Sequence, residues 1–306
     1  MTTGALLVLA PLRLEARAVR AGAPGATVVR TGMGPRRATR AGHGLPPAAG
    51  AVAVAGLCGA LQRGLRAGDV VVASEVRGPD GTVTRCAPPA LVATALRSRG
   101  LRVHVGPLAC TERLVRGPAR GELATTGALA VDMESAWLAP GAAAALPGAP
   151  FTVVRVVVDT VESPLLRPAT VASGVRALRV LRTAAAALAD WAAAAGPRQV
   201  LLAGPRSFCA GPASDDVGSA NSSSSVRLVE VARREGCAAH LVDDASDIDL
   251  RWLAGAARVG LAAGASAPPV LVDDIVSALS GLGPVEITER TVVEEQLQFQ
   301  LPKEVS

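Results

Sequence analysis

The chain has 306 residues, half of them hydrophobic, and 31 basic against 26 acidic side chains give a net charge of +5. The basic residues are spread along the chain without aromatic neighbours, so we expect no nucleic-acid partner. No run of about 18 apolar residues occurs, so we expect no membrane span. Five widely spaced cysteines without a C-x-x-C pair are typical of a reduced, cytoplasmic protein.

The first two-thirds of the chain alternates short apolar runs with helical patterns. Residues 5–10 predict a buried strand that leads into a helix, because charged residues follow at once. Further buried strands are predicted at 52–55, 69–73, 102–105 and 152–158. An Ala/Leu/Arg pattern over 173–195 predicts a long helix that ends at a Gly-Pro pair. We place the domain boundary there, which gives domains 1–196 and 197–306.

Shorter elements follow this boundary. Strands are predicted at 199–203, 239–242 and 258–261, and helices at 226–235, 247–254 and 269–281. Because strands and helices alternate, the pattern predicts a smaller second α/β domain with a parallel sheet. With no Tyr and only three Phe, the cores must consist mainly of small and branched aliphatic residues.

Several segments of the first domain carry chemistry-bearing residues in a characteristic order. They are 8–15, 31–34, 55–61, 68–72, 131–134 and 150–159. In this order and spacing they resemble the purine nucleoside phosphorylase and methylthioadenosine/adenosylhomocysteine nucleosidase superfamily. The resemblance covers about residues 1–190. It implies a three-layer α/β domain that cleaves N-glycosidic bonds, without a cofactor and as a homo-oligomer.

The resemblance assigns roles to individual carboxylates. Cleaving an N-glycosidic bond leaves negative charge on the base, so an acid must protonate it. Asp159, at a strand end where open α/β sheets place ligands, matches the family's catalytic Asp. Glu134 matches the glutamate that binds the ribose hydroxyls, with Met133 beside it, and Glu15 matches the carboxylate that positions the attacking water. Read singly, each carboxylate could equally be a strand-end cap or a solvated helix residue.

Glycines and arginines supply the remaining candidates. Gly32, Gly34, Gly56 and Gly59 would let backbone N–H groups approach the ribose or an anion closely, although each could simply form a turn. Phosphorolysis would need a phosphate site, for which the candidates are Arg36, Arg37, Arg40 and Arg85. Nothing in the sequence selects among them, so water and phosphate both remain open as the nucleophile.

Within this superfamily, the chain resembles the phosphorylase-like proteins of bacterial hopanoid synthesis. That resemblance implies removal of adenine from an adenosylhopane-like substrate. An apolar pocket with few aromatic residues would suit such a lipid. The expected partner is therefore a small nucleoside or an adenosylated lipid.

The second domain resembles a different enzyme. Residues 200–211, 218–223, 241–244, 263–268 and 301–305 resemble 4-hydroxy-3-methylbut-2-enyl diphosphate reductase of the LytB type. That family binds a [4Fe–4S] cluster through three cysteines, but only 212–216 separate the first motif from the last third, so the middle region is missing. Cys209 alone matches a cluster ligand, and one thiolate cannot hold a cubane. We therefore expect that the cluster is not retained.

Part of the reductase's diphosphate-binding set is present. Ser222, Ser223 and Ser266 match family serines, whereas Ser224 stands where the family has Asn. The alternative is a polar loop that caps the following helix. Three functions thus remain: a nucleosidase or phosphorylase, an iron–sulfur reductase, and a non-catalytic fusion in which the second domain is a docking surface.

Overall fold

The structure is a computed structural model that describes residues 5–47, 49–160, 169–203, 216–217, 223–262 and 269–290. The chain forms two compact units. Unit 1 comprises Met1–Arg198, Asp244–Ala257 and Asp273–Val285, and unit 2 comprises Gln199–Asp243, Arg258–Val272 and Glu286–Ser306. The domain boundary after residue 196 stays a prediction.

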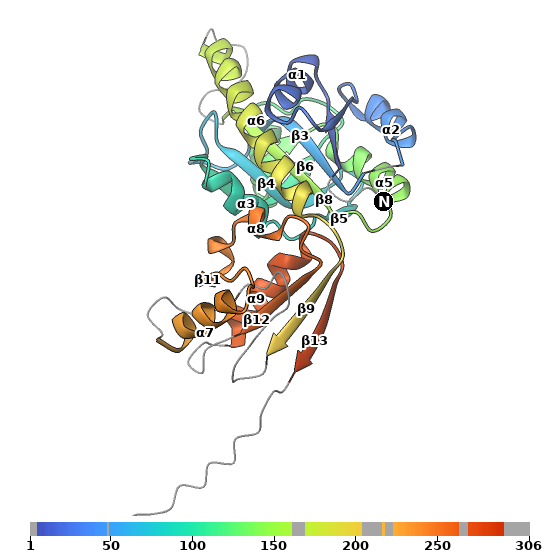
Figure 1. Ribbon diagram of the computed structural model, residues 1–306. Helices are drawn as coiled ribbons and strands as arrows, with labels where there is room; N and C mark the ends of the chain where they lie inside the picture. Colours follow the sequence, from blue (N-terminus) through green and yellow to red (C-terminus); the bar gives the residue numbers. More distant parts are fainter. Residues whose placement is uncertain are drawn as a thin grey trace, which may run out of the picture. The chain divides into compact units, whose positions relative to one another are not determined.

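Unit 1 is built on a mixed eight-stranded sheet (Figure 1). Its strands are β1 (Leu6–Ala10), β2 (Thr27–Arg30), β3 (Ala51–Ala60), β4 (Val70–Arg77), β5 (Val83–Arg85), β6 (Val103–Cys110), β7 (Ala130–Asp132) and β8 (Phe151–Asp159). They follow the order β2-β1-β3-β7-β6-β4-β5, and β8 pairs with both β3 and β4. Strands β3, β7, β6, β4 and β8 therefore close into a ring of paired strands, which brings the ends of β3, β7 and β8 together.

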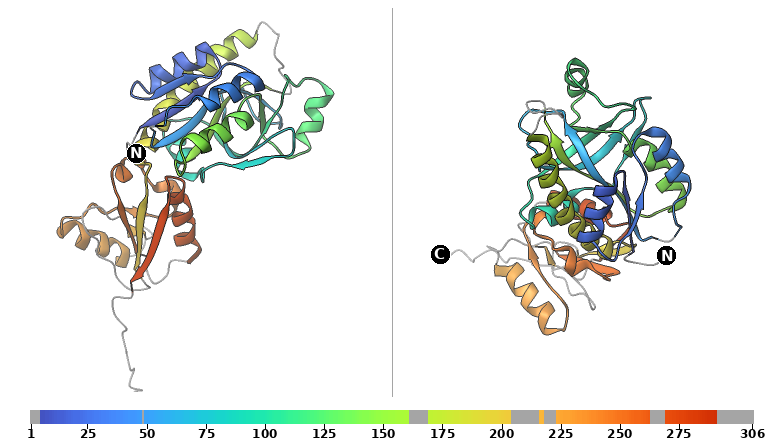
Figure 2. Two further views of the ribbon diagram at one scale, coloured as in Figure 1. Left: turned by 90° about the vertical axis from the view of Figure 1, so that its right-hand side faces the viewer. Right: turned by 90° about the horizontal axis from the view of Figure 1, so that it is seen from above.

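Helices lie on both faces of this sheet (Figure 2). They are α1 (Arg13–Gly22), α2 (Pro35–His43), α3 (Ala90–Arg97), α4 (Pro118–Ala124), α5 (Ser135–Ala145) and α6 (Ala169–Ala194). Helix α1 packs against α6, and α2 packs against α5. The arrangement confirms the predicted three-layer α/β class.

The core of unit 1 consists of small aliphatic residues, as the composition predicts. Strand β1 is buried along its whole length, and Val52–Val54 and Val153–Val157 lie in the same apolar interior. Burying charged side chains is energetically unfavourable in strands that are covered on both faces. The sequences of these strands are therefore nearly continuous apolar runs. A charged residue, Arg155, is nevertheless buried in the middle of β8.

Unit 2 contains the predicted parallel pairing. Strand β9 (Arg198–Ala203) lies between β12 (Arg258–Ala262) and β13 (Val285–Arg290), and β9 runs parallel to β12. Strand β10 (Asp216–Val217) pairs in parallel with β11 (Leu241–Val242). The helices of the second half of the chain are α7 (Ser223–Arg234), α8 (Leu250–Leu253) and α9 (Pro269–Ser280).

The helix predicted over 247–254 is wrong in its extent. The segment forms a 3-10 turn at Ala245–Asp247 and then the single-turn helix α8. Asp244 accepts a hydrogen bond from the Ser246 N–H, and Asp249 accepts one from the Arg251 N–H. Two successive side-chain caps start two short helices, because each cap competes with a continuous helical ladder.

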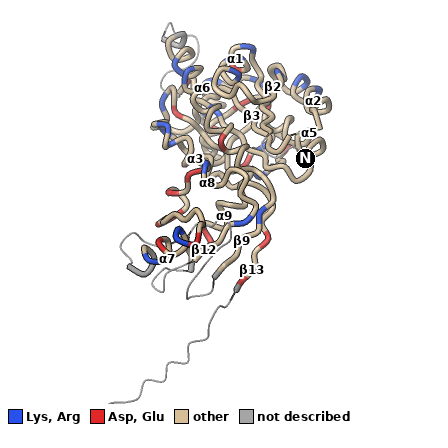
Figure 3. The backbone as a smooth tube through the Cα atoms, viewed as in Figure 1, with Lys and Arg blue, Asp and Glu red and all other residues tan. Residues whose placement is uncertain are grey.

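The charged side chains of unit 1 are dispersed. Figure 3 shows Lys and Arg distributed over α1, α2 and α6 instead of gathered on one element. No helix in the described part of the chain combines the length and the apolarity that crossing a bilayer requires. The absence of a nucleic-acid partner, the cytoplasmic location and the homo-oligomer stay predictions.

Candidate functional site

A cavity of about 240 Å³ lies beyond the carboxyl ends of β1, β6, β7 and β8. This is the edge where ligands bind in open α/β sheets. The three predicted carboxylates Glu15, Glu134 and Asp159 all line it, although they come from separate segments. The rest of the described lining is mostly apolar and contains no aromatic side chain: Pro11, Leu12, Met33, Leu57, Cys58, Gly59, Thr111, Leu114, Val115, Arg120, Val131, Asp132, Met133 and Val158.

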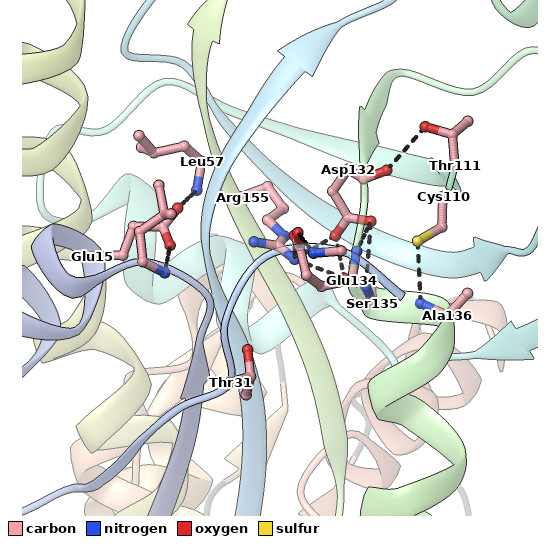
Figure 4. Close-up of polar contacts among 12 residues, drawn as sticks. Glu15, Thr31, Leu57, Cys110, Thr111, Asp132, Glu134, Ser135, Ala136 and Arg155 are labelled. Atoms are coloured by element: carbon pink, nitrogen blue, oxygen red, sulfur yellow. Dashed lines mark hydrogen bonds and ion pairs between the residues drawn. The ribbon is translucent and has the colours of Figure 1, made fainter. Parts of the chain in front are cut away.

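Glu15 is positioned by the first turn of α1. One carboxylate oxygen accepts a hydrogen bond from the Leu12 N–H at 2.6 Å, and the other accepts one from the Leu57 N–H at 2.8 Å (Figure 4). The residue is only 2% exposed. Burial raises the pKa of Glu15 above the ordinary 4.5, while Arg155 and the two N–H groups partly oppose the rise. Glu15 is therefore a fixed carboxylate that holds a proton to higher pH than usual.

Glu134 is held at the start of α5. Its backbone N–H and that of Ser135 both point to one Asp132 oxygen, at 3.4 and 3.3 Å. One Glu134 carboxylate oxygen accepts a hydrogen bond from the Gly34 N–H at 3.0 Å. Burial raises the pKa of Glu134, and Arg155 opposes the rise. Asp132 thus accepts from the N–H groups at the start of α5, and the loop after β2 orients the glutamate.

Arg155 lies at the centre of the acidic cluster (Figure 4). One guanidinium nitrogen, Nη2, is 2.5 Å from Asp132 and 3.6 Å from Glu134. The side chain is 1% exposed, yet Nε and Nη1 have no hydrogen-bond partner among the described residues. Buried donors are rarely left unpaired, because desolvation without a partner is costly. The unpaired nitrogens therefore suggest a polar ligand at this point.

Gly56 explains how Glu15 and Arg155 approach each other. It is the strand partner of Arg155 in the pairing of β3 with β8. A Cβ at this position would lie 2.5 Å from Arg155 Nη1 and 2.8 Å from Glu15 Oε1. A side chain on this residue would collide with both groups, so the close approach requires glycine.

Asp159 forms an ion pair that the sequence does not predict. The Arg120 Nη1 donates to one carboxylate oxygen of Asp159 at 2.5 Å, and both side chains are less than a tenth exposed. Gly59 is the strand partner of Asp159, and a Cβ there would lie 2.8 Å from Arg120 and 3.0 Å from Asp159. Glycine at this position leaves room for the pair.

The structure distributes the other predicted site residues unevenly. Met133 and Gly59 line the cavity, whereas Gly32 and Gly34 belong to the loop that contacts Glu134. Among the described lining residues Arg120 is the one arginine, and the phosphate candidates Arg36, Arg37, Arg40 and Arg85 are not part of the lining. Cys209, Ser222 and Ser266 lie outside the described residues, and Ser223 is the first residue of α7.

Three residues of the site were missed by sequence reasoning. Arg155 had a signal, since a charge inside a run of valines must find buried partners. Asp132 also had one, because an acid three residues before a helix residue is a typical cap. Arg120 had none, because its role depends on a contact with Asp159, which lies 39 residues further along the chain.

The described residues do not fit an iron–sulfur cluster, and Cys209 lies outside them. Within the ranges that the structure describes, no group of three or more His, Cys, Asp or Glu side chains converges as a metal site. Cys237, the one cysteine of residues 217–306, is buried in an apolar cluster with Val229, Ala232 and Ala239. A cubane needs several thiolates around one point.

Comparisons with known proteins agree with the two-part organisation. The phosphorylase superfamily profile matches residues 13–194, and the LytB protein profile matches residues 217–280. The S-adenosylhomocysteine nucleosidase of Streptococcus pyogenes, solved with 5-methylthiotubericidin, has a TM-score of 0.51 and 22% identity, covering 61% of this chain and 98% of that one. At this identity the likeness shows the fold.

The matches to curated proteins fall on the C-terminal part. The chain is 46% identical over 89 residues to 4-hydroxy-3-methylbut-2-enyl diphosphate reductase 2 of Mycobacterium bovis, and 53% identical over 90 residues to the reductase of Leifsonia xyli. Each match covers 29% of this chain and 27% of the relative, so the chain spans about a quarter of the reductase. By its larger match the chain belongs to the phosphorylase superfamily, and by its second match it is a fusion of that domain with a LytB segment.

Proposed function

We propose that this chain hydrolyses the N-glycosidic bond of a purine nucleoside and releases the free base. One observation carries the proposal: Glu15, Glu134 and Asp159 surround a single cavity of about 240 Å³, and buried Arg155 lies beside two of them. Carboxylates on several sides of a sugar stabilise the positive charge that develops when the C–N bond breaks.

Each group has an assigned task. Glu134 accepts hydrogen bonds from the ribose hydroxyls, and its charge favours an oxocarbenium-like ring. We assign the attacking water to the space between the Glu15 carboxylate and the Arg155 nitrogens that have no partner among the described residues. The water oxygen attacks C1′ and its proton passes to Glu15, while the electrons of the C–N bond leave with the base at the Asp159 end.

Water is favoured over phosphate by the charge at the nucleophile position. Glu15 is fixed there by two backbone N–H groups, and a second acid, Asp132, lies beside Arg155. A phosphate dianion would meet these carboxylates with the Arg155 guanidinium as the nearby positive charge, because Arg120 is paired with Asp159. Like charges a few ångströms apart repel strongly in a site from which water is excluded.

The test is to incubate the purified chain with adenosine and inosine and to separate base, ribose and ribose 1-phosphate by chromatography. Hydrolysis predicts free ribose and a rate that does not change when phosphate is added. Ribose 1-phosphate as the product, with a rate that depends on phosphate, would show a phosphorylase instead. No base release from any nucleoside would contradict the proposal.

The raised pKa of Glu15 predicts the pH dependence of base release. Only the ionised carboxylate can accept the water proton, and burial holds the proton on Glu15 to a pH above 4.5. We expect kcat/KM to rise with pH through a limb that lies above the range of an exposed glutamate. Glu15→Gln should lose this limb and about 100-fold in kcat. Glu122→Gln, on the exposed face of α4, is the control and should keep the wild-type profile.

The mouth of the cavity suits an apolar substituent on the sugar. Leu12, Met33 and Leu114 line it and are 39%, 53% and 48% exposed. Burying such side chains against a ligand contributes about 25 cal/mol per Å² of apolar surface. We therefore include adenosylated lipids of the adenosylhopane type among the proposed substrates. The measurement is kcat/KM for adenosine derivatives with 5′ alkyl chains of increasing length, which should rise with chain length.

The rival function is the reductase, which the LytB match favours. It requires a cluster that the described residues do not fit. Iron analysis and a visible spectrum of anaerobically purified chain decide between them. We expect well below one iron per chain and no absorbance band near 400 nm, whereas about four irons per chain would favour the reductase. Neither iron nor base release, in a folded chain, would favour the docking fusion.

A further inference from the structure

A second cavity, of about 830 Å³, adjoins the first. Leu114, Val115, Arg120 and Asp159 line both cavities. The first cavity, at about 240 Å³, is smaller than the roughly 300–1,000 Å³ that small-molecule sites usually have, whereas the second falls within that range. A ligand of ordinary size therefore needs room beyond the first cavity, and the second cavity offers it beside the Asp159–Arg120 pair.

The two cavities differ in the sign of their charge. Acidic side chains outnumber basic ones in the described lining of the first cavity. In the described lining of the second, Asp159 is the one acid and is paired with Arg120, and Arg63 and Arg116 are two further arginines. An anionic group is therefore repelled from the first cavity and attracted to the second.

Arg63 and Arg116 are available to a ligand. Both are exposed, and neither side chain forms a hydrogen bond or an ion pair with another residue that the structure describes. The walls that carry them are joined, because Gln62 Nε2 donates to the Ala124 carbonyl at 2.8 Å and to the Ala128 carbonyl at 2.9 Å. Arg63 follows this glutamine, and Arg116 leads into α4. Guanidinium groups on two connected walls suit a carboxylate or a phosphate, whose oxygens accept several N–H groups.

The lining also sets the order in which a ligand meets these groups. Leu114 and Val115 line both cavities, whereas Arg63 and Arg116 line only the second. The proposed function has the base leave at the Asp159 end of the first cavity. An anionic group that reaches the two arginines is therefore attached to the base, and its linker passes the two apolar side chains.

We propose that the second cavity binds an anionic group, a carboxylate or a phosphate, that the substrate carries on the exocyclic amino group of its base. That amino group lies across the purine from the glycosidic nitrogen, so a substituent on it extends away from the sugar. The inference rests on the proposed function for the end at which the base leaves, and it names a preferred class among purine nucleosides. Arg63 and Arg116 are specificity-determining residues, while bond cleavage still uses the groups of the first cavity. A substituent on the base is compatible with an apolar group on the sugar.

Binding of free bases tests the inference without requiring turnover. Calorimetry compares adenine that bears a 2-carboxyethyl group on its amino nitrogen with the 2-carbamoylethyl analogue, a neutral isostere, and with the 2-phosphonoethyl analogue. We expect the carboxylate to bind about tenfold more tightly than the amide. The phosphonate distinguishes the two anions: tighter binding than the carboxylate assigns a phosphoryl group to the natural substrate, and weaker binding assigns a carboxylate.

The double variant Arg63→Gln/Arg116→Gln should bring the carboxylate and the amide within about twofold of each other. The matched control is Arg17→Gln/Arg179→Gln, which removes the same charge from exposed positions of α1 and α6. The control should keep the tenfold preference, because neither residue belongs to the described lining of either cavity. For the corresponding nucleosides, kcat/KM for base release should show the same preference.

Equal binding of the carboxylate and the amide by the wild type overturns the inference, and so does a preference that survives in Arg63→Gln/Arg116→Gln. The wild-type comparison decides alone if the double variant fails to fold. A chain that prefers the carboxylate base but cleaves no nucleoside contradicts the proposed function and leaves the second cavity as an anion site. A chain that cleaves adenosine but binds both substituted bases alike contradicts only the inference.

Discussion

Arg155→Met is expected to lower the free energy of unfolding by about 3–5 kcal/mol at neutral pH. Among the described residues, Arg155 is the one guanidinium that contacts the Asp132 and Glu134 carboxylates, and it also lowers the pKa of Glu15. Removing it leaves buried acids without a counter-charge, which costs far more than the loss of one hydrogen bond. Urea unfolding, followed by far-ultraviolet circular dichroism, measures the change.

The pH dependence of the unfolding free energy distinguishes loss of the Arg155 counter-charge from simple loss of packing. Burial raises the pKa of Glu15 and Glu134, so both carboxylates bind a proton more tightly in the folded than in the unfolded chain. Their charge therefore costs stability above the folded pKa, and that cost disappears as the pH falls and they are protonated. The deficit of Arg155→Met should shrink on acidification. Arg17→Met, at an exposed position of α1, is the control and should change stability by less than about 0.5 kcal/mol. A deficit that stays constant with pH would count against the electrostatic explanation.

Asp159→Asn is expected to lower the rate of base release about 1000-fold. The substitution removes the negative charge that holds Arg120 at the leaving-group end. There, Arg120 Nη1 lies 2.5 Å from a carboxylate oxygen of Asp159, and both side chains are less than a tenth exposed. An asparagine also brings an N–H group against the guanidinium, so the pair is no longer fixed at the leaving-group end. The measurement is single-turnover release of adenine, which reports the bond-breaking step.

The control for this variant is Asp190→Asn on α6, since Asp190 also pairs with an arginine, Arg99, but does not line the cavity. Asp190→Asn should release adenine at nearly the wild-type rate. Because Asp159→Asn leaves Arg120 buried without a counter-charge, its fold must be checked by circular dichroism. The double variant Asp159→Asn/Arg120→Gln removes both charges and should regain stability without regaining activity. Wild-type rates of base release in a folded Asp159→Asn protein would show that Asp159 has no role in bond breaking.

Much of the fold follows from local patterns in the sequence. The apolar runs that become β1, β3, β4, β6 and β8 are short and buried on both faces, so their sequence alone indicates strands. The long helix is also predictable, although it begins at Ala169, four residues before the predicted start. The element predictions are weaker where side-chain caps compete with helix formation, as between Asp244 and Asp249.

The sequence by itself determined the order of strands and helices, the two family relationships and the residue types suited to glycosidic cleavage. Only the tertiary structure decided which of these residues meet. The Gly34 N–H reaches Glu134 across 100 residues, and the Leu57 N–H reaches Glu15 across 42. The ion pairs of Arg155 and Arg120 arise in the same way, from strands and helices distant in the chain. The physical reason is that periodicity and capping act over a few residues, whereas the pairing of buried charges depends on how a closed ring of strands brings distant segments together.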